Sequence, residues 1–125
     1  MKPKNILVVD DDSEITMIIE EILKQKDYKV TVAHDGLNAI EESKKEQVDL
    51  ILMDIRLPIF SGFWFCDAFK RKPETKHVPI VIVSSLSGPE DVQKAFRVGA
   101  CAYLKKPFLS DELLTVVQKA LKEAA

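Results

Sequence analysis

Two periodicities of apolar residues alternate along the chain. Short runs that are apolar and largely β-branched, typical of strands, occur at Ile6–Val9, Val30–Ala33, Val48–Met53, Pro79–Val83 and Ala100–Leu104. Between these runs the apolar residues recur with helical spacing. The clearest stripe of an amphipathic helix is formed by Ile15, Ile18, Ile19, Ile22 and Leu23. The pattern therefore predicts five strands, each followed by a helix.

The ends of the later helices are marked by residues that favour helix termini. Ser87 followed by Glu90 matches a capping box, and Gly99 suits the C-terminal end of the same helix. Ser110 and Asp111 are predicted to begin the last helix.

Strands that alternate with helices form right-handed βαβ units, which build a parallel sheet covered by helices on both faces. The continuous apolar character of Ile6–Val9, Leu50–Met53 and Ile80–Val83 fits central strands that are buried on both sides. The sequence predicts an α/β fold with a doubly wound five-stranded parallel sheet, (βα)5, as one domain over residues 1–125. Ligands of such sheets bind at the carboxyl ends of the strands, so candidate functional residues are sought there.

Composition and charge exclude several classes of protein. The net charge is −2, from 18 basic and 20 acidic residues, so no basic excess favours nucleic acid or anionic membranes. No apolar run approaches the ~18 residues that span a bilayer, and the N-terminus does not resemble a signal peptide. Two cysteines and two isolated histidines lack the spacing of a zinc site. We therefore expect a cytoplasmic protein without membrane insertion.

Acidic residues follow the first and third apolar runs. Asp10, Asp11 and Asp12 come directly after the first, and Asp54 follows the third. If these strands are neighbours, carboxylates ~4 Å apart repel by about 4 kcal/mol at an effective dielectric near 20. Such a cluster needs protonation or a cation, and oxygen ligands with room for water suit Mg²⁺. The alternative is structural: the three aspartates cap the first helix, and Asp54 is an ordinary loop acid.

Two further polar groups follow the fourth and fifth runs. Ser84 is expected to bring a hydroxyl to this edge of the sheet, and Lys106 an ammonium. Carboxylates that bind a divalent cation, a hydroxyl and a lysine are together the groups needed to bind a phosphoryl group. One of the carboxylates can also accept that group as a nucleophile.

With these residues in this order, the chain resembles the receiver domains of two-component response regulators. The resemblance covers essentially the whole chain and is carried by Ile6–Asp12, Asp54–Pro58 with Ser61-Gly62, Val83–Ser85, Gly99-Ala100 and Tyr103–Phe108. It implies a flavodoxin-like sheet with strand order 2-1-3-4-5. It also implies a phosphoacceptor switch, which takes a phosphoryl group from the phosphohistidine of a sensor histidine kinase or histidine phosphotransfer protein. Output would be altered binding of a downstream protein partner by a monomer, with dimerisation on phosphorylation left open.

The resemblance assigns roles to the acidic residues. Asp54 corresponds to the phosphoacceptor and to a ligand of Mg²⁺. Asp11 corresponds to a direct metal ligand, Asp10 to one that acts through a water molecule, and the backbone carbonyl of Arg56 to a further ligand. Asp12 is interpreted as a helix cap or an outer acid.

Three other residues receive roles in the same way. Lys106 would hold a phosphoryl oxygen, and its bond to Pro107 is expected to be cis. Ser84 corresponds to the switch hydroxyl and Tyr103 to the aromatic residue that follows it inward. Structural alternatives exist for each: a surface lysine, a strand-end cap and a half-buried strand aromatic.

The helix expected after Ser61-Gly62 begins with an unusual run of aromatic residues. Successive helical positions point about 100° apart, so the three side chains of Phe63, Trp64 and Phe65 cannot all face the core. Phe65 and Phe69 are the expected core pair, which leaves Trp64 pointing outward. Trp64 is then either part of an interface or an ordinary exposed residue.

Two other functions compete with the phosphoacceptor switch. A small Mg²⁺-dependent phosphohydrolase with an aspartyl nucleophile would share the Asp-x-Asp spacing of Asp10 and Asp12. However, Glu14 stands where haloacid dehalogenase-like phosphatases have threonine or valine, and no substrate cap is evident. An interaction module independent of phosphorylation is the other alternative, which the complete set of site residues disfavours.

Overall fold

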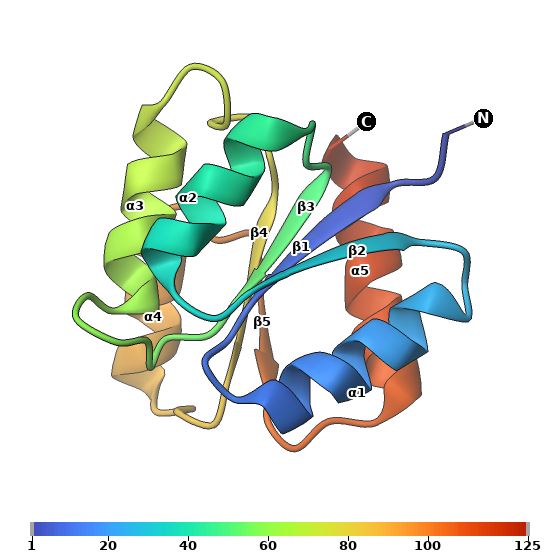
Figure 1. Ribbon diagram of the computed structural model, residues 1–125. Coiled ribbons are helices and arrows are strands. Elements are labelled where there is room, and N and C mark those ends of the chain that lie inside the picture. The colour runs from blue at the N-terminus through green and yellow to red at the C-terminus, as the bar shows by residue number, and fades with distance from the viewer. Residues whose placement is uncertain (1, 125) are drawn as a thin grey trace.

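Strands and helices alternate along the whole chain in the computed structural model, which describes residues 2–124 (Figure 1). The strands are β1 (Asn5–Val9), β2 (Lys29–Ala33), β3 (Leu50–Met53), β4 (Ile80–Ser84) and β5 (Ala102–Lys105). The helices are α1 (Ser13–Lys24), α2 (Gly36–Lys45), α3 (Gly62–Arg71), α4 (Pro89–Arg97) and α5 (Ser110–Ala124). All strand pairs are parallel, in the order β2-β1-β3-β4-β5. The predicted fold class and strand order are confirmed.

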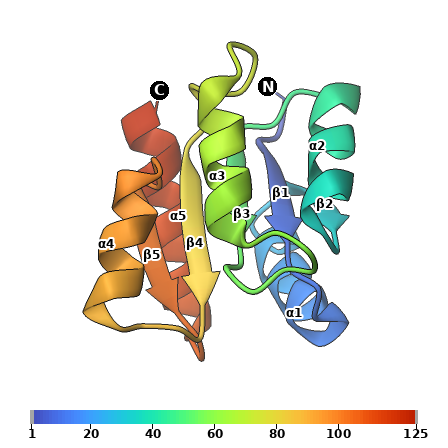
Figure 2. The same ribbon diagram turned by 90° about the vertical axis from the view of Figure 1, so that its left-hand side faces the viewer.

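Helices cover both faces of the sheet. Figure 1 shows α2, α3 and α4 on one side and α1 and α5 on the other, and Figure 2 gives the view toward α3 and α4. Successive residues of a strand point to opposite faces. Accordingly, Leu7 and Val9 of β1 belong to the buried cluster under α2–α4, whereas Ile6 and Val8 belong to the cluster under α1 and α5. This two-sided burial explains the continuous apolar runs of the central strands.

The register of the central strands brings their carboxyl ends level with one another. Val9 of β1 pairs with Met53 of β3, and Met53 pairs with Ile82 of β4. One residue later, the backbone N–H of Asp54 donates to the carbonyl oxygen of Val9 at 3.0 Å. The residues that directly follow β1 and β3 are therefore neighbours, as the strand order requires.

Several predicted boundaries differ from the structure, among them that of the fifth strand, which covers Ala102–Lys105 rather than Ala100–Leu104. The third strand begins at Leu50 rather than Val48, although Val48 is buried. The predicted capping box is wrong: α4 has Gly88 at its N-cap and no side-chain cap. The helix begins at Pro89, so Ser87 lies one residue before the N-cap. Proline favours the first helical position because its φ is already helical and its missing N–H has no partner there. The predicted start of the last helix at Ser110 is confirmed.

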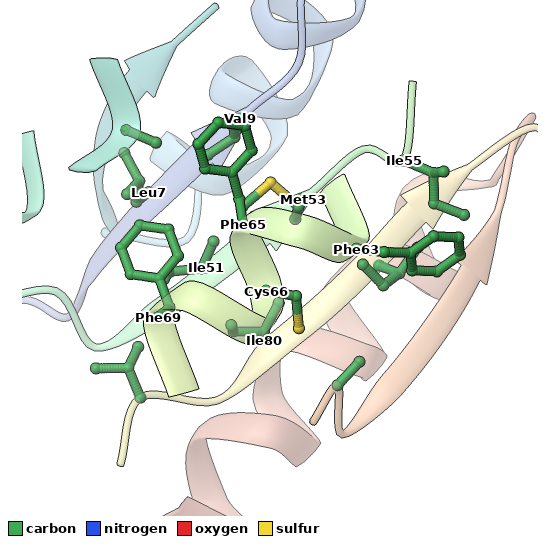
Figure 3. Close-up of a cluster of buried hydrophobic side chains, with 14 of the residues drawn as sticks. Leu7, Val9, Ile51, Met53, Ile55, Phe63, Phe65, Cys66, Phe69 and Ile80 are labelled. Carbon is green, nitrogen blue, oxygen red and sulfur yellow. The ribbon is translucent and has the colours of Figure 1, made fainter. Parts of the chain in front are cut away.

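The aromatic run of α3 divides between core and solvent. Phe65 and Phe69 are buried in the cluster shown in Figure 3, as predicted, and Phe63 is buried as well. Trp64 points outward and is 49% exposed. Its indole stacks on the ring of Phe60 in the preceding loop. None of the helices formed by residues 2–124 is long and apolar enough to cross a membrane.

Candidate functional site

Three aspartates meet at the carboxyl edge of the sheet. Asp10 and Asp11 follow β1 and Asp54 follows β3, and one carboxylate oxygen from each lies within 4.8 Å of the others. Asp10 and Asp54 are buried, whereas Asp11 is exposed. The structure therefore brings together the three carboxylates that the sequence placed at two strand ends.

Lys106 extends into this cluster from the loop after β5. Its Nζ lies 2.6 Å from Oδ2 of Asp10 and 3.6 Å from Oδ2 of Asp54. The Lys106 side chain is only 15% exposed, and its backbone N–H donates to the carbonyl of Ser84 at 2.9 Å. The peptide bond from Lys106 to Pro107 is cis, as expected. A surface lysine is excluded by this burial.

The two buried carboxylates differ in how fully their oxygens are engaged. In Asp10, Oδ1 accepts a hydrogen bond from the Asp12 N–H at 2.9 Å, and Oδ2 accepts one from Lys106. In Asp54, Oδ1 accepts from the Ile55 N–H at 2.8 Å. Its Oδ2 lies beyond normal hydrogen-bond distance from Lys106. The Asp54 oxygen that faces Lys106 is therefore the one among these four carboxylate oxygens without a close hydrogen bond.

Electrostatics make this edge of the sheet attractive to a cation. Burial raises the pKa of Asp54 above its ordinary value, and the negative charge of Asp10 raises it further. The ammonium of Lys106 and the backbone amides of Ile55 and Arg56 oppose both effects. Because three carboxylates face one ammonium, the net charge of the cluster is negative. An all-oxygen donor set with this charge fits a hard divalent cation such as Mg²⁺.

Ser84 and Tyr103 are linked through the backbone of Leu86. Ser84 is completely buried at the end of β4, and its Oγ accepts a hydrogen bond from the Leu86 N–H at 3.2 Å. Tyr103, half-buried on β5, donates its hydroxyl to the Leu86 carbonyl oxygen. Burial raises the pKa of the Tyr103 phenol, and the neighbouring Ser84 side chain partly opposes this. Residue type alone gave no signal for this backbone link.

Two further residues near the site, Asp12 and Arg56, lie at its exposed margin. Asp12 is the N-cap of α1 and accepts a hydrogen bond from the Glu14 N–H at 2.9 Å, which confirms its interpretation as a helix cap. The side chain of Arg56 is exposed, and the metal-binding role of its backbone carbonyl stays a prediction.

The sequence indicated Gly62 only as part of the Ser61-Gly62 motif, without a structural reason for glycine. Its N–H donates to the Ile55 carbonyl at 2.7 Å. A Cβ atom at this position would lie 1.9 Å from the carbonyl oxygen of Asp54. The close approach of these two backbone segments therefore requires glycine. Gly62 fixes the path of the chain directly after Asp54.

Comparison with known proteins identifies the family of this chain. The response regulator receiver domain matches residues 6–118. The chain is 33% identical over 117 residues to the DNA-binding dual master transcriptional regulator RpaA of Synechocystis, covering 94% of this chain and 48% of RpaA. It thus spans about half the length of that curated relative, and 22% of the length of the response regulator PleD of Caulobacter vibrioides.

A solved structure gives the same result. The chemotaxis protein CheY4 of Vibrio cholerae is 31% identical and superposes with a TM-score of 0.90, covering 94% of this chain and 98% of CheY4. The sequence match and the structural superposition thus point to the same family. The chain belongs to the receiver domain family of two-component response regulators.

Proposed function

We propose that Asp54 accepts a phosphoryl group from the phosphohistidine of a sensor histidine kinase or histidine phosphotransfer protein, in a Mg²⁺-dependent reaction. The modified domain then binds a downstream protein partner differently. The observation that carries this proposal is the convergence of Asp54 with Asp10, Asp11 and Lys106 at one edge of the sheet. Family membership supports the general class, a phosphoacceptor signalling switch.

The transfer step balances without another reactant. A carboxylate oxygen of Asp54 forms a bond to phosphorus while the phosphorus–nitrogen bond of phosphohistidine breaks. The departing imidazole keeps the electron pair and takes up a proton from solvent, and Asp54 becomes an acyl phosphate. Asp54 is favoured over Asp10 as the nucleophile because both Asp10 oxygens already accept hydrogen bonds. The ammonium of Lys106, 3.6 Å from Asp54 Oδ2, is close enough to pair with a transferred phosphoryl oxygen.

Mg²⁺ would be held by the carboxylates of Asp10, Asp11 and Asp54, with the backbone carbonyl of Arg56 as a further ligand. Bound there, it would supply positive charge against the phosphoryl oxygens. The protein's own contribution is to hold the three carboxylates within reach of one ion and to keep Lys106 beside them.

Replacing Asp11 with asparagine is expected to separate metal binding from folding stability. In metal-free buffer the variant should melt roughly 2 °C higher, because one charge of a repelling cluster is gone while solvent screens this exposed carboxylate. Mg²⁺ should stabilise the wild type but not the variant. Thermal denaturation with and without Mg²⁺ measures both effects. A variant that melts lower and still gains stability from Mg²⁺ contradicts them.

Ser84 is expected to transmit the modified state of Asp54 to Tyr103. A phosphoryl group on Asp54 offers the Ser84 hydroxyl proton a charged acceptor. Movement of the hydroxyl toward it would lengthen the hydrogen bond that Ser84 Oγ now accepts from the Leu86 N–H. Because Leu86 also accepts the hydroxyl of Tyr103, movement at Ser84 should change the surroundings of the tyrosine ring. We expect Ser84→Ala to accept phosphate but to lose this response.

NMR measures that uncoupling directly. Beryllofluoride, a phosphoryl analogue, should shift the amide signals of Leu86 and Tyr103 in the wild type and in the neighbouring control variant Ser85→Ala. In Ser84→Ala the signals next to Asp54 should still shift, whereas that of Tyr103 should not. An unchanged Tyr103 response in Ser84→Ala would show that the signal takes another route.

The proposed function is tested with a small phosphodonor. The wild type is incubated with phosphoramidate and Mg²⁺, or with phosphoramidate and EDTA, and its intact mass is measured. The expected result is the addition of one phosphoryl group with Mg²⁺ and little addition with EDTA. No addition with Mg²⁺ would contradict the proposal. Rapid turnover of p-nitrophenyl phosphate would instead support the phosphohydrolase alternative.

A further inference from the structure

Four apolar side chains form an exposed surface that the phosphoacceptor function does not use. They are Leu37 in the first turn of α2, Ile59 and Phe60 in the loop before α3, and Trp64 in the first turn of α3. We call these four residues the aromatic patch. Figure 2 shows α2 and α3 beside each other, with the loop that precedes α3 next to them. Clustered apolar exposure of this kind is typical of an interaction surface rather than of scattered single residues.

The aromatic side chains of the patch are held in place by the core. The rings of Phe60 and Trp64 stack with centroids 4.7 Å apart and planes 18° apart. Both rings also meet the buried ring of Phe65 edge-on, at 6.3 Å from Phe60 and 5.0 Å from Trp64. Binding of a partner here therefore costs little side-chain entropy in the protein's own aromatic residues, because they are already ordered.

A groove of about 210 Å³ adjoins the patch, between the start of α2 and the loop before α3. Phe65 lies at its apolar side, and the charged residues that line it are Asp35 and Glu41. Among residues 2–124, those lining the groove include no lysine, arginine or histidine. The Asp35 carboxylate also caps α2 by accepting from the Asn38 N–H at 2.7 Å, which fixes its position. The groove thus combines an apolar wall with a fixed negative charge.

The backbone at Ile59 holds its side chain in an exposed and strained position. Its φ is 70°, in the left-handed region that a β-branched residue rarely adopts. Its side chain is 87% exposed, so packing in the core does not offset this strain. Glycine or asparagine would suit the backbone better. The conformation belongs to a tight turn that is closed by the hydrogen bond from the Phe60 N–H to the Pro58 carbonyl oxygen at 2.8 Å, and this turn presents the Ile59 side chain to solvent.

We propose that the aromatic patch and the adjoining groove bind a protein segment that is both apolar and cationic. An apolar side chain of the segment would pack on Ile59 and the Phe60–Trp64 stack. A lysine or arginine would pair with Asp35 and Glu41, and cations also bind favourably over exposed aromatic rings. The groove is smaller than the roughly 300–1,000 Å³ of small-molecule pockets, and the apolar surface continues beyond it. A peptide segment matches this shape better than a small ligand.

Trp64 provides a direct readout, because it is the only tryptophan in the chain. The probe is a short helical peptide of leucine and lysine, and its counterpart has glutamate in place of lysine. The lysine peptide should move Trp64 emission to shorter wavelength in a saturable titration, and the glutamate peptide should not. Equal binding of both peptides, or binding of neither, would overturn the proposal.

Variants separate the patch from the rest of the surface. Ile59→Asn should raise the melting temperature by relieving the backbone strain, yet weaken binding of the lysine peptide about tenfold. Asp35→Asn keeps a helix-capping side chain, and combined with Glu41→Gln it should weaken binding at least fivefold. Met17→Ala, which removes an exposed apolar side chain on α1, is the control and should bind normally.

Two results would contradict the proposal. One is unchanged affinity in both the Ile59 and the Asp35/Glu41 variants. The other is self-association in sedimentation experiments that buries Trp64 without peptide, because the surface would then bind a second copy of this chain.

Discussion

Replacing Lys106 with methionine is expected to destabilise the protein by about 3–5 kcal/mol at neutral pH without metal, as is usual when one partner of a buried ion pair is removed. The Lys106 ammonium lies 2.6 Å from Asp10 and 3.6 Å from Asp54, and its side chain is largely buried. Without it, two buried carboxylates face each other with no counter-charge. The free energy of unfolding, measured by urea denaturation, checks this prediction.

The destabilisation should depend on pH and on metal. Lys106 holds the pKa of Asp54 down against burial and Asp10, so its removal raises that pKa further. The folded variant then binds protons more tightly than the unfolded chain, and its stability falls as pH rises through the region above the ordinary aspartate pKa. Acidification and Mg²⁺ should both recover stability. Lys105→Met, at an exposed position, is the matched control. A loss that is equal at low and neutral pH would show that lost packing, rather than charge, is responsible.

Replacing Gly62 with alanine is expected to cost about 3 kcal/mol, because the new methyl group collides with backbone atoms that can move only at the expense of stability. Its Cβ would lie 1.9 Å from the carbonyl oxygen of Asp54 and 2.8 Å from the carbonyl carbon, which are both backbone atoms. The loop after β3 must therefore shift, which also breaks the hydrogen bond from the Gly62 N–H to Ile55. Since Asp54 moves with its backbone, Mg²⁺ binding should weaken too.

Gly88→Ala is the control for this prediction. A Cβ at Gly88 meets only the Asp91 carboxylate, at 3.5 Å, so this change should cost no more than about 1 kcal/mol, through the weaker N-cap. Urea denaturation of both variants compares the two sites. If Gly62→Ala is as stable as Gly88→Ala, the loop after Asp54 is more adaptable than the structure indicates.

The fold was predictable because the sequence marks strand ends clearly. Apolar runs that stop at Asp10, Asp54 and Ser84 indicate both the buried strands and the polar edge, and parallel strands place those ends together. The order of the strands came from resemblance rather than from the apolar pattern. The Ser87–Glu90 capping box failed because a proline at the first helical position competed with it.

Details of the site depended on three-dimensional packing that no local pattern reports. Lys106 was expected to hold a phosphoryl oxygen, but the sequence did not indicate that its nearest carboxylate is Asp10, at 2.6 Å, with Asp54 at 3.6 Å. The link between Ser84 and Tyr103 through Leu86 uses backbone atoms, which carry no residue-specific signal. The sequence did indicate that Trp64 points outward, whereas its stacking on Phe60 follows from the loop conformation.

Intact-mass analysis of Asp54→Asn tests the central claim most directly. Wild type, Asp54→Asn and Asp12→Asn are each incubated with phosphoramidate and Mg²⁺. Asp12→Asn is the matched control, because asparagine preserves the cap of α1 while a neighbouring charge is removed. We expect the gain of one phosphoryl group in the wild type and in Asp12→Asn, and no gain in Asp54→Asn. A full gain in Asp54→Asn would contradict the claim, because another residue would then be the phosphoacceptor.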